Sequence, residues 1–464
     1  MREQQNMRKI LYTLLLFLPL LASSCFNDEE ETELDDYCYI KSVSLGSIRR
    51  AIHTTDTLGR DTVYYTTFTA SSVDITIDQK ALTIENRDSL LYGAQPSAVM
   101  VNISYEGATL MYRPADDLQE WTAYNSKDSL DLSTPLHLLL WANNGVDFRV
   151  YTMKLNIHQQ EGDSLYWAQV DEDATAFKDM TYTRATVHQG CLMVFGESPY
   201  GVQLAKRNGV ASSGIWTTQI TNLPATAQAS TLRQQGSSLY MSTSEGTLYT
   251  STDGANWQQT GQTIPTLSLV AVSEKYYYAL IDGTLQRSSD AVEWKAEALD
   301  DDPQLLPTSQ IYSRIYTQKN GNERILICGN RDVESDQTAV VWSKLWYDEL
   351  TEEDAEWTYF TQTHENQYSC PRLENLTILP YDGRMVAIGG NSLGKGTRKA
   401  LDHMYFSNDN GITWKADPEL HLPRELLGVS GPITATVDEN NYIWIIANQQ
   451  VWRGRLNRLG FARR

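Results

Sequence analysis

One kind of segment recurs along the last two thirds of this 464-residue chain, and this recurrence constrains the fold more than any other feature. In each copy a serine and an aspartate come shortly before a tryptophan, and a run of β-forming residues precedes them. The three clearest copies contain Ser251, Asp253, Gly254 and Trp257; Ser288, Asp290 and Trp294; and Ser407, Asp409, Gly411 and Trp414. Repeats of roughly 40 to 60 residues predict an array of units that bury their apolar faces against one another.

The three copies resemble Asp boxes, a motif in which every side chain has a structural task. The aspartate accepts backbone N–H bonds across a tight turn between strands, the glycine permits the backbone angles, and the tryptophan packs into the neighbouring sheet. The third copy, Ser-Asn-Asp-Asn-Gly-Ile-Thr-Trp, is complete, whereas the second has no glycine. We therefore predict structural, not catalytic, roles for these residues.

The repeats predict a six-bladed β-propeller over residues 161–464. Degenerate units end at Trp216 and Trp357, which brings the tryptophan-terminated units to five. The expected second strands of the blades are residues 191–196, 239–243, 276–281, 325–329, 385–390 and 442–447. The sixth unit lacks its closing strand, and residues 165–170 match that strand. Pairing the two ends of the domain in one blade would close the ring and remove unpaired edges.

Residues 37–160 predict a separate all-β domain, which we interpret as an immunoglobulin-like sandwich. Short apolar segments alternate there with polar turns, as is typical of sandwiches. The expected strands include residues 72–77, 98–105, 136–141 and 148–158. The last two form a predicted hairpin through Asn143, Asn144 and Gly145, which tolerate positive φ. A polar linker at residues 159–163 separates this domain from the repeats.

The N-terminus has the pattern of an export signal that ends in a cysteine. Arg8 and Lys9 precede an apolar run at residues 10–21, which is shorter than the ~20 residues that span a bilayer. The segment Ala-Ser-Ser before Cys25 resembles the lipobox of bacterial lipoproteins. We predict that residues 1–24 are a lipoprotein signal peptide and that Cys25 is lipidated. The alternative is an ordinary secretory signal with a chance cysteine.

Residues 25–36 are rich in aspartate and glutamate, and such a run of like charge stays extended as a tether. The position resembles the acidic export signal of surface lipoproteins in Bacteroidetes. We therefore expect a lipid-anchored protein of the outer membrane that is exposed at the cell surface. A spacer that leaves the protein facing the periplasm is the alternative.

Composition and missing motifs exclude several functions. The chain has 38 Lys and Arg against 58 Asp and Glu, a net charge of −20, so nucleic acid is not an expected partner. Walker, dinucleotide and H-E-x-x-H motifs are absent. The histidines are dispersed, and we expect neither a metal site nor a cofactor. Cys38, Cys191, Cys328 and Cys370 show no C-x-x-C spacing, so we expect buried thiols and leave disulfide pairing open.

Arginines on predicted first strands are the candidate ligand-binding residues, because first strands line the channel of a propeller. Arg184 and Arg314 occupy matching places in two blades, and Arg372 and Glu374 approach a third such strand. A partly cationic channel would suit a carboxylated ligand. Alternatively, these arginines pair with local carboxylates or donate to blade carbonyls. Residues 332–356, a long insertion, form either a contact surface or a solvated hairpin.

The signal, the sandwich and the divergent Asp-box propeller together resemble a family of Bacteroidetes surface lipoproteins of unknown function. The resemblance implies the two-domain layout and the cell-envelope location, and it supplies no activity. We expect a non-enzymatic binding or scaffold protein with a glycan or protein ligand, attached to the membrane by its lipid.

The alternative is a sialidase-like glycoside hydrolase acting on a carboxylated sugar, since Asp boxes also occur in six-bladed sialidases. That chemistry needs an arginine cluster, a tyrosine nucleophile activated by a glutamate, and an acid/base aspartate. The Arg-Ile-Pro segment expected early in such a propeller is absent. Three arginines beside a Tyr and Glu pair at one channel mouth would favour the hydrolase, and a hydrophobic or carboxylate-lined channel would exclude it.

Overall fold

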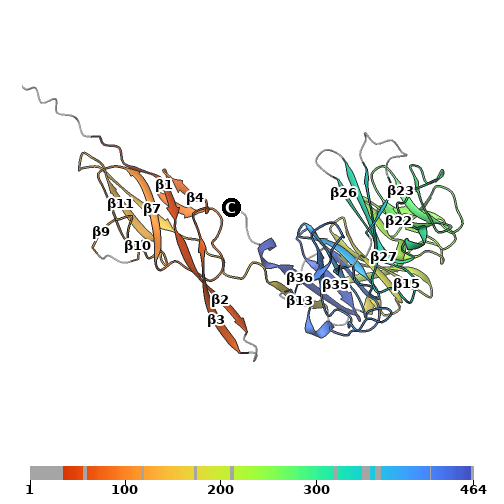
Figure 1. Cartoon of the computed structure of the whole chain (residues 1–464). Coiled ribbons are helices and arrows are strands. Elements are labelled where there is room, and N and C mark those ends of the chain that lie inside the picture. Colours follow the sequence, from red (N-terminus) through yellow and green to blue (C-terminus); the bar gives the residue numbers. More distant parts are fainter. Residues whose placement is uncertain are drawn as a thin grey trace, which may run out of the picture. The chain divides into compact units, whose positions relative to one another are not determined.

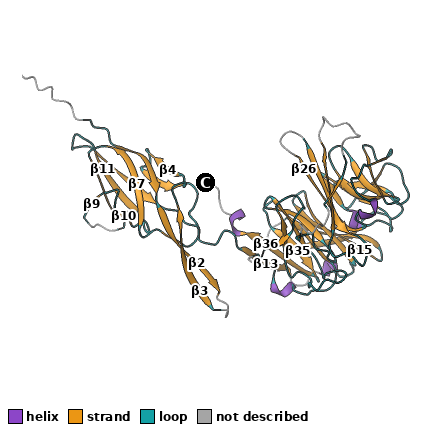
Figure 2. Ribbon diagram, viewed as in Figure 1, coloured by secondary structure: helices purple, strands orange, loops and turns teal. Residues whose placement is uncertain are grey.

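The computed structural model describes residues 35–55, 60–116, 120–171, 175–209, 214–317, 322–346, 356–360, 367–417 and 420–460. The chain divides into two compact units, with the boundary between Glu161 and Gly162. Strands dominate both units (Figure 2), and no helix among the described residues is long and apolar enough to cross a membrane. The predicted signal peptide, Cys25 and the tether up to residue 34 lie outside the described residues.

The first unit is a β domain whose strands form three sheets. The first sheet has the order β1 (Tyr39–Leu45), β7 (Val99–Glu106), β10 (Ser129–Leu130); the second β4 (Ile75–Asp78), β5 (Thr83–Asn86), β12 (Phe148–Lys154), β11 (Leu136–Trp141), β8 (Thr109–Pro114), β9 (Thr122–Ala123); the third β3 (Asp61–Thr69), β2 (Ser47–Thr55), β6 (Ala94–Gln95). Strand alternation explains the core, because Val99, Val101 and Ile103 of β7 are buried while the residues between them are exposed. Side chains of the first two sheets share one apolar cluster.

The sequence predicts one hairpin of this domain and gives no signal for a second one. The predicted hairpin pairs Trp141 with Phe148, and its turn has Gly145 at φ 68°. Its second strand ends at Lys154 instead of residue 158, and beyond that end Ile157 forms an isolated parallel bridge to Leu90. The hairpin of β2 and β3 (Figure 1) was not predicted, since β3 is exposed along most of its length and shows no apolar alternation.

The second unit is a β-propeller with four-stranded antiparallel blades. In the described part of the chain six such sheets are present. Their strands, from the inner edge outward, are β14 (Tyr182–His188), β15 (Cys191–Ser198), β16 (Gly201–Asn208), β17 (Trp216–Ile220); β18 (Arg233–Gln235), β19 (Ser238–Ser242), β20 (Leu248–Ser251), β21 (Gln258–Thr260); β22 (Ser268–Val272), β23 (Tyr277–Ile281), β24 (Thr284–Ser288), β25 (Lys295–Ala296); β26 (Ser309–Thr317), β27 (Glu323–Asn330), β28 (Val340–Trp346), β29 (Thr358–Tyr359); β30 (Thr377–Tyr381), β31 (Arg384–Ile388), β32 (Tyr405–Ser407), β33 (Lys415–Ala416); and β34 (Ile433–Val437), β35 (Ile443–Ala447), β36 (Gln450–Leu456), β13 (Leu165–Asp171). Short 3₁₀ helices lie at η1 (Thr175–Phe177), η2 (Ala229–Thr231), η3 (Pro303–Leu305), η4 (Arg424–Leu426) and η5 (Asn457–Gly460).

The two ends of the propeller domain meet in one sheet. Strand β13, the first of the domain, pairs antiparallel with β36, the last, from Leu165 opposite Leu456 to Gln169 opposite Trp452 (Figure 1). Gly454 permits this approach, since a Cβ there would lie 2.4 Å from the Trp167 ring. The pairing gives β36 a neighbour on its outer side, where an unpaired strand edge would otherwise face solvent.

The Asp-box residues form the turns between third and fourth strands. In the first copy Asp253 Oδ1 accepts hydrogen bonds from the backbone N–H groups of Ala255 and Asn256, at 2.9 and 2.8 Å. Gly254 has φ 77°, and its carbonyl accepts a hydrogen bond from Trp257 Nε1 at 2.9 Å. The Trp257 ring packs edge-on against Phe195 of the preceding sheet, with 5.9 Å between centroids. This turn therefore joins two blades.

The aspartates of the other two copies also accept backbone N–H bonds across the turn, Asp290 from residues two and three positions on and Asp409 from a residue four positions on. In the third copy Asp409 Oδ1 accepts from Thr413 N at 2.9 Å, and Trp414 Nε1 donates to the Gly411 carbonyl at 3.0 Å. In the second copy Ala291 stands where the others have glycine and takes φ 61°, a conformation that costs an alanine energy. Sequence deviation from the motif thus leaves the turn in place.

Candidate functional site

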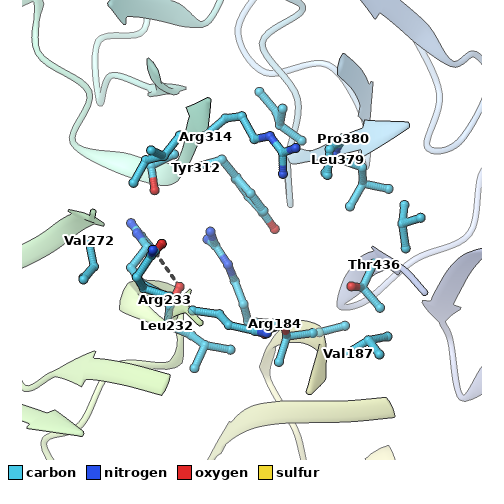
Figure 3. Close-up of a pocket in the computed structure, with 18 of the residues that line it drawn as sticks. Arg184, Val187, Leu232, Arg233, Val272, Tyr312, Arg314, Leu379, Pro380 and Thr436 are labelled. Carbon is cyan, nitrogen blue, oxygen red and sulfur yellow. Dashed lines mark hydrogen bonds between the residues drawn. The ribbon is translucent and has the colours of Figure 1, made fainter. Parts of the chain in front are cut away.

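A pocket of about 390 Å³ lies inside the propeller, and the innermost strands of all six sheets line it. We call it the channel pocket. Figure 3 shows Arg184, Arg233, Tyr312 and Arg314 around one opening. The described residues that line it include no aspartate and no glutamate. The chain has a net charge of −20, yet the described lining of this pocket has arginines and no carboxylate.

Arg184 of β14 is held in place by backbone carbonyls. Its Nη1 donates to the carbonyls of Ser230 and Ile311 at 3.2 and 3.0 Å. Its guanidinium carbon lies 3.5 Å from the centroid of the Tyr312 ring, a cation–π stack that fixes the plane of the group. Arg184 thus donates to blade carbonyls, which is the alternative to ligand binding that the sequence left open, and it also lines the channel pocket.

Arg233 of β18 is the channel residue that sequence reasoning missed. Its Nε donates to Val270 O at 2.6 Å, its Nη1 to Leu232 O at 2.8 Å, and its Nη2 to Ile311 O at 3.2 Å. Burial lowers the pKa of Arg233 well below its ordinary value, and the nearby Arg184 cation lowers the pKa further. The two guanidinium groups repel one another, and the described residues that line the channel pocket place no carboxylate beside them. Any anion in the pocket would relieve that repulsion.

Arg314 of β26 is the least constrained of the three arginines. Its side chain is half-buried, and its guanidinium carbon lies 5.1 Å from the Tyr316 ring centroid. The buried Nε has no hydrogen-bond partner among the described residues. A buried donor without a partner costs free energy, so this group is available to a ligand.

A second pocket of about 260 Å³ lies at the opposite ends of several inner strands, and Arg233 lines both pockets. Tyr182 and Glu197 also line it, and they stand directly opposite one another in the pairing of β14 with β15. Burial raises the pKa of Tyr182 to about 12. Burial also raises the pKa of Glu197, although its Oε1 accepts a hydrogen bond from Ala229 N at 3.0 Å.

The structure does not bring Arg372 and Glu374 to either pocket. Both precede β30, and Arg372 Nη1 and Nη2 donate to the carbonyls of Asp336 and Arg331 at 3.0 and 3.1 Å. Glu374 Oε2 accepts a hydrogen bond from Asn391 Nδ2 at 3.3 Å. Two of the four candidate residues therefore meet in the channel pocket, and two have local partners outside it.

Two further predictions concern metals and the long insertion. Within the described ranges no group of three or more His, Cys, Asp or Glu side chains could hold a metal ion. The stretch 332–356 contains β28 (Val340–Trp346), the mostly buried third strand of its blade, so this part of it is neither a contact surface nor a solvated hairpin. Residues 347–355 lie outside the described residues.

The family comparisons match both units of this chain. Residues 161–464 match the model described as the DUF6242 beta propeller domain, and residues 43–155 match the DUF6242 N-terminal domain, a domain of unknown function. The chain belongs to the DUF6242 family. This confirms an N-terminal β domain followed by a propeller in this DUF6242 chain. A search of the curated proteins found no match.

Several solved propellers are similar to the DUF6242 propeller at low identity. The Penicillium chrysogenum α-L-arabinanase complexed with arabinobiose has 12% identity and a TM-score of 0.37, covering 63% of this chain and 98% of its own. YCF48 from Cyanidioschyzon merolae has 14% identity and 0.35, covering 62% and 98%. The Trypanosoma rangeli sialidase in complex with DANA has 12% and 0.37, covering 60% and 55%. At these TM-scores the likenesses carry no functional information.

Proposed function

We propose that this chain is a lipid-anchored outer-membrane protein, exposed at the cell surface, whose propeller binds a glycan or protein ligand without catalysing a reaction. In this proposal the six four-stranded sheets form one ring, closed by the pairing of β13 with β36. The N-terminal unit is an immunoglobulin-like sandwich that, with the acidic tether, holds the propeller away from the membrane. The channel pocket binds an anionic group of the ligand, and we infer a carboxylate.

The absence of a carboxylate among the described lining residues of the channel pocket is the observation that supports this binding most. Arg184, Arg233 and Arg314 come from three different strands, so their convergence is a property of the assembled propeller. A planar guanidinium binds a carboxylate through paired hydrogen bonds, and such charge-assisted bonds strengthen where water is excluded. The Nε of Arg314 supplies a donor that has no hydrogen-bond partner among the described residues.

A sialidase-like hydrolase is the second candidate, and the Tyr182 and Glu197 pair is the observation that favours it. Two features favour binding over hydrolysis. The raised pKa of Tyr182 keeps its phenol protonated and a poor nucleophile. The pair also lines the second pocket, whereas Arg314 lines the channel pocket.

The test is a glycan-array screen that compares carboxylated with neutral glycans, using the full chain with Cys25→Ser so that no lipid is attached. Arg314→Gln is the informative variant because Arg314 holds no carbonyl in the described structure. Each lost charge-assisted hydrogen bond is worth about 1.5–3 kcal/mol, so we expect roughly 10- to 100-fold weaker binding. Arg398→Gln removes an exposed arginine outside both pockets and is the matched control.

Equal binding by wild type and Arg314→Gln would refute the channel pocket as the site. Sugar released from any bound glycan by the wild type, and lost in Tyr182→Phe, would replace the binding proposal with the hydrolase. Binding of neutral glycans alone would contradict recognition of a carboxylate.

The location is tested separately with intact cells. We expect Cys25→Ser to abolish incorporation of a labelled fatty acid, and protease added outside the cells to digest the wild-type protein. Protection of the lipidated protein until the outer membrane is broken would place it on the periplasmic side instead.

A further inference from the structure

Two of the cysteines that the sequence left unpaired meet inside the propeller. Cys328 Sγ lies 3.5 Å from Cys370 Sγ, although the two residues are 42 positions apart in the sequence. Cys328 is 0% exposed and Cys370 is 2% exposed. We propose that Cys328 and Cys370 form a disulfide bond in the mature protein.

The local structure holds the two thiols on elements that lead into different blades. Cys328 is in the middle of β27, paired with Tyr312 on one side and Val341 on the other. Cys370 precedes β30, and its carbonyl accepts a hydrogen bond from Ala339 N at 3.0 Å. Because both segments are anchored by backbone hydrogen bonds, the sulfur atoms meet in the native fold and not by chance rotation of a loose loop.

The distance between the sulfur atoms requires only a local adjustment. A disulfide has an S–S length of about 2.05 Å, so closure shortens the separation by roughly 1.4 Å. The polarizable thiols already share one apolar cluster with Leu326 and Leu373. The bond would join the blade containing β27 to the segment that leads into β30, and the chain between the two cysteines includes residues 332–356.

The other two described cysteines have different surroundings. Cys38 belongs to the N-terminal domain, and Cys191 of β15 is half-buried with its Sγ 3.8 Å from Asn208 Oδ1. The proposal therefore assigns one pairing and leaves two thiols reduced.

The bond forms by thiol–disulfide exchange with a small-molecule or protein disulfide. The thiolate of one cysteine attacks the external disulfide and releases one of its thiols. The second cysteine then displaces the other thiol, so two protons and two electrons leave the protein and the oxidant is reduced to two thiols. Burial raises the pKa of the Cys370 thiol well above its ordinary value, so exchange takes place during folding, before the site closes. Oxidising conditions outside the cytoplasm favour this step.

The experiment maps the cysteines of the full chain carrying Cys25→Ser. The protein is unfolded with reductant, refolded in reduced and oxidised glutathione, alkylated in denaturant and digested without reduction. We expect a peptide containing Cys328 joined to one containing Cys370, about 2 Da lighter than the two free thiol peptides together. Cys38 and Cys191 should be alkylated. Alkylation of all four cysteines, or a bond from Cys328 to either of the other two, would overturn the proposal.

Thermal unfolding gives a second readout that does not depend on peptide recovery. We expect the glutathione-refolded protein to unfold about 5 °C above the same protein with reductant, because the bond restricts the unfolded chain. Cys191→Ser should retain this reductant-sensitive shift and Cys328→Ala should lose it. A shift retained in Cys328→Ala would contradict the pairing, and if that variant does not fold, the wild-type peptide map alone decides.

Discussion

Two clusters of buried cations in the same propeller are built in opposite ways. One of them, which we call the blade cluster, consists of Arg287, Lys344, Glu297 and Trp357. The Glu297 carboxylate accepts hydrogen bonds from Lys344 Nζ and, at 2.6 Å, from Trp357 Nε1, and it lies 3.3 Å from Arg287 Nη1. The three charged side chains there are no more than 6% exposed. At the channel pocket Arg184 and Arg233 donate to backbone carbonyls, and Arg184 and Arg314 lie over tyrosine rings. The described residues that line this pocket include no carboxylate.

The comparison separates a structural ion network from a candidate binding site. Removing charges from water costs several kcal/mol per ion, and an internal counter-ion offsets that cost. In the blade cluster the carboxylate of Glu297 pairs with both cations. The channel pocket has no counter-ion among its described lining residues, and the lowered pKa of Arg233 reflects burial beside the like charge of Arg184. An external anion would complete the channel pocket.

The largest expected effect comes from removing the internal counter-ion of the blade cluster. Glu297→Gln leaves Lys344 and Arg287 buried without their carboxylate, and we expect a loss of about 3–5 kcal/mol in the free energy of unfolding. Chemical denaturation measures this loss, and Glu293→Gln, an exposed carboxylate on the same blade, is the control. An equal effect of both variants would show that the blade cluster is not a paired network.

The second effect is stabilisation by an external anion at the channel pocket. Adding citrate at about 100 times its dissociation constant should raise the free energy of unfolding by about 2.7 kcal/mol. The increase should be smaller in Arg314→Gln and at high salt, because ions screen the attraction. An unchanged melting temperature across a citrate titration would show that the channel pocket does not bind this anion, and the two clusters would then not differ in this respect.

A third variant supplies the channel pocket with the carboxylate that it lacks. Gln234 lines the pocket and accepts a hydrogen bond from Thr186 Oγ1 through Oε1, which a glutamate retains. Gln234→Glu should weaken anion binding about 10-fold, or ~1.4 kcal/mol, because it repels the ligand and pairs with the arginines. Gln219→Glu on the outer strand β17 is the matched control. Calorimetric titration of both variants with citrate decides the outcome.

The smallest effect concerns carboxylates that the propeller uses at its turns. Partial desolvation raises the pKa of Asp253, but hydrogen bonds from Asn256, Ala255 and Ser251 outweigh it and lower the pKa to about 2. The stability that this group supplies is therefore present above the unfolded pKa of about 3.9 and is lost as pH falls towards 2. Allowing for solvent screening, we expect roughly 1 kcal/mol.

The measurement for this turn is the free energy of unfolding between pH 2 and 5 for the wild type and Asp253→Asn, which cannot titrate. We expect the wild type to lose more stability on acidification than the variant does. Parallel curves would show that the Asp253 carboxylate has no role in the turn.

The propeller could be predicted from the sequence because its turn chemistry is local. In each Asp box the serine, aspartate and tryptophan lie within eight residues. The hydrogen bonds that define the turn therefore join residues of one short segment. The predicted pairing of residues 165–170 with the C-terminal strand depended on counting strands, and β13 does pair with β36. The β2 and β3 hairpin lacked the apolar alternation that such reasoning needs.

The candidate site could be predicted only in part, because the strand ends decide which arginines reach the channel. Arg184 and Arg314 lie within β14 and β26 and reach it, whereas Arg372 lies five residues before β30 begins and donates to nearby carbonyls. Arg233 was missed because β18 has three residues and gives almost no strand signal.

The sequence by itself determined the all-β class, the two-domain order and the repeated turns, since these depend on side chains close together in the chain. Only the tertiary structure decided that three arginines share a pocket lined by no described carboxylate, and that Cys328 meets Cys370. The physical reason is that both arrangements join residues from different blades. The distances between the arginines and between the two sulfur atoms depend on how the sheets pack around the channel. A local sequence pattern does not contain this information.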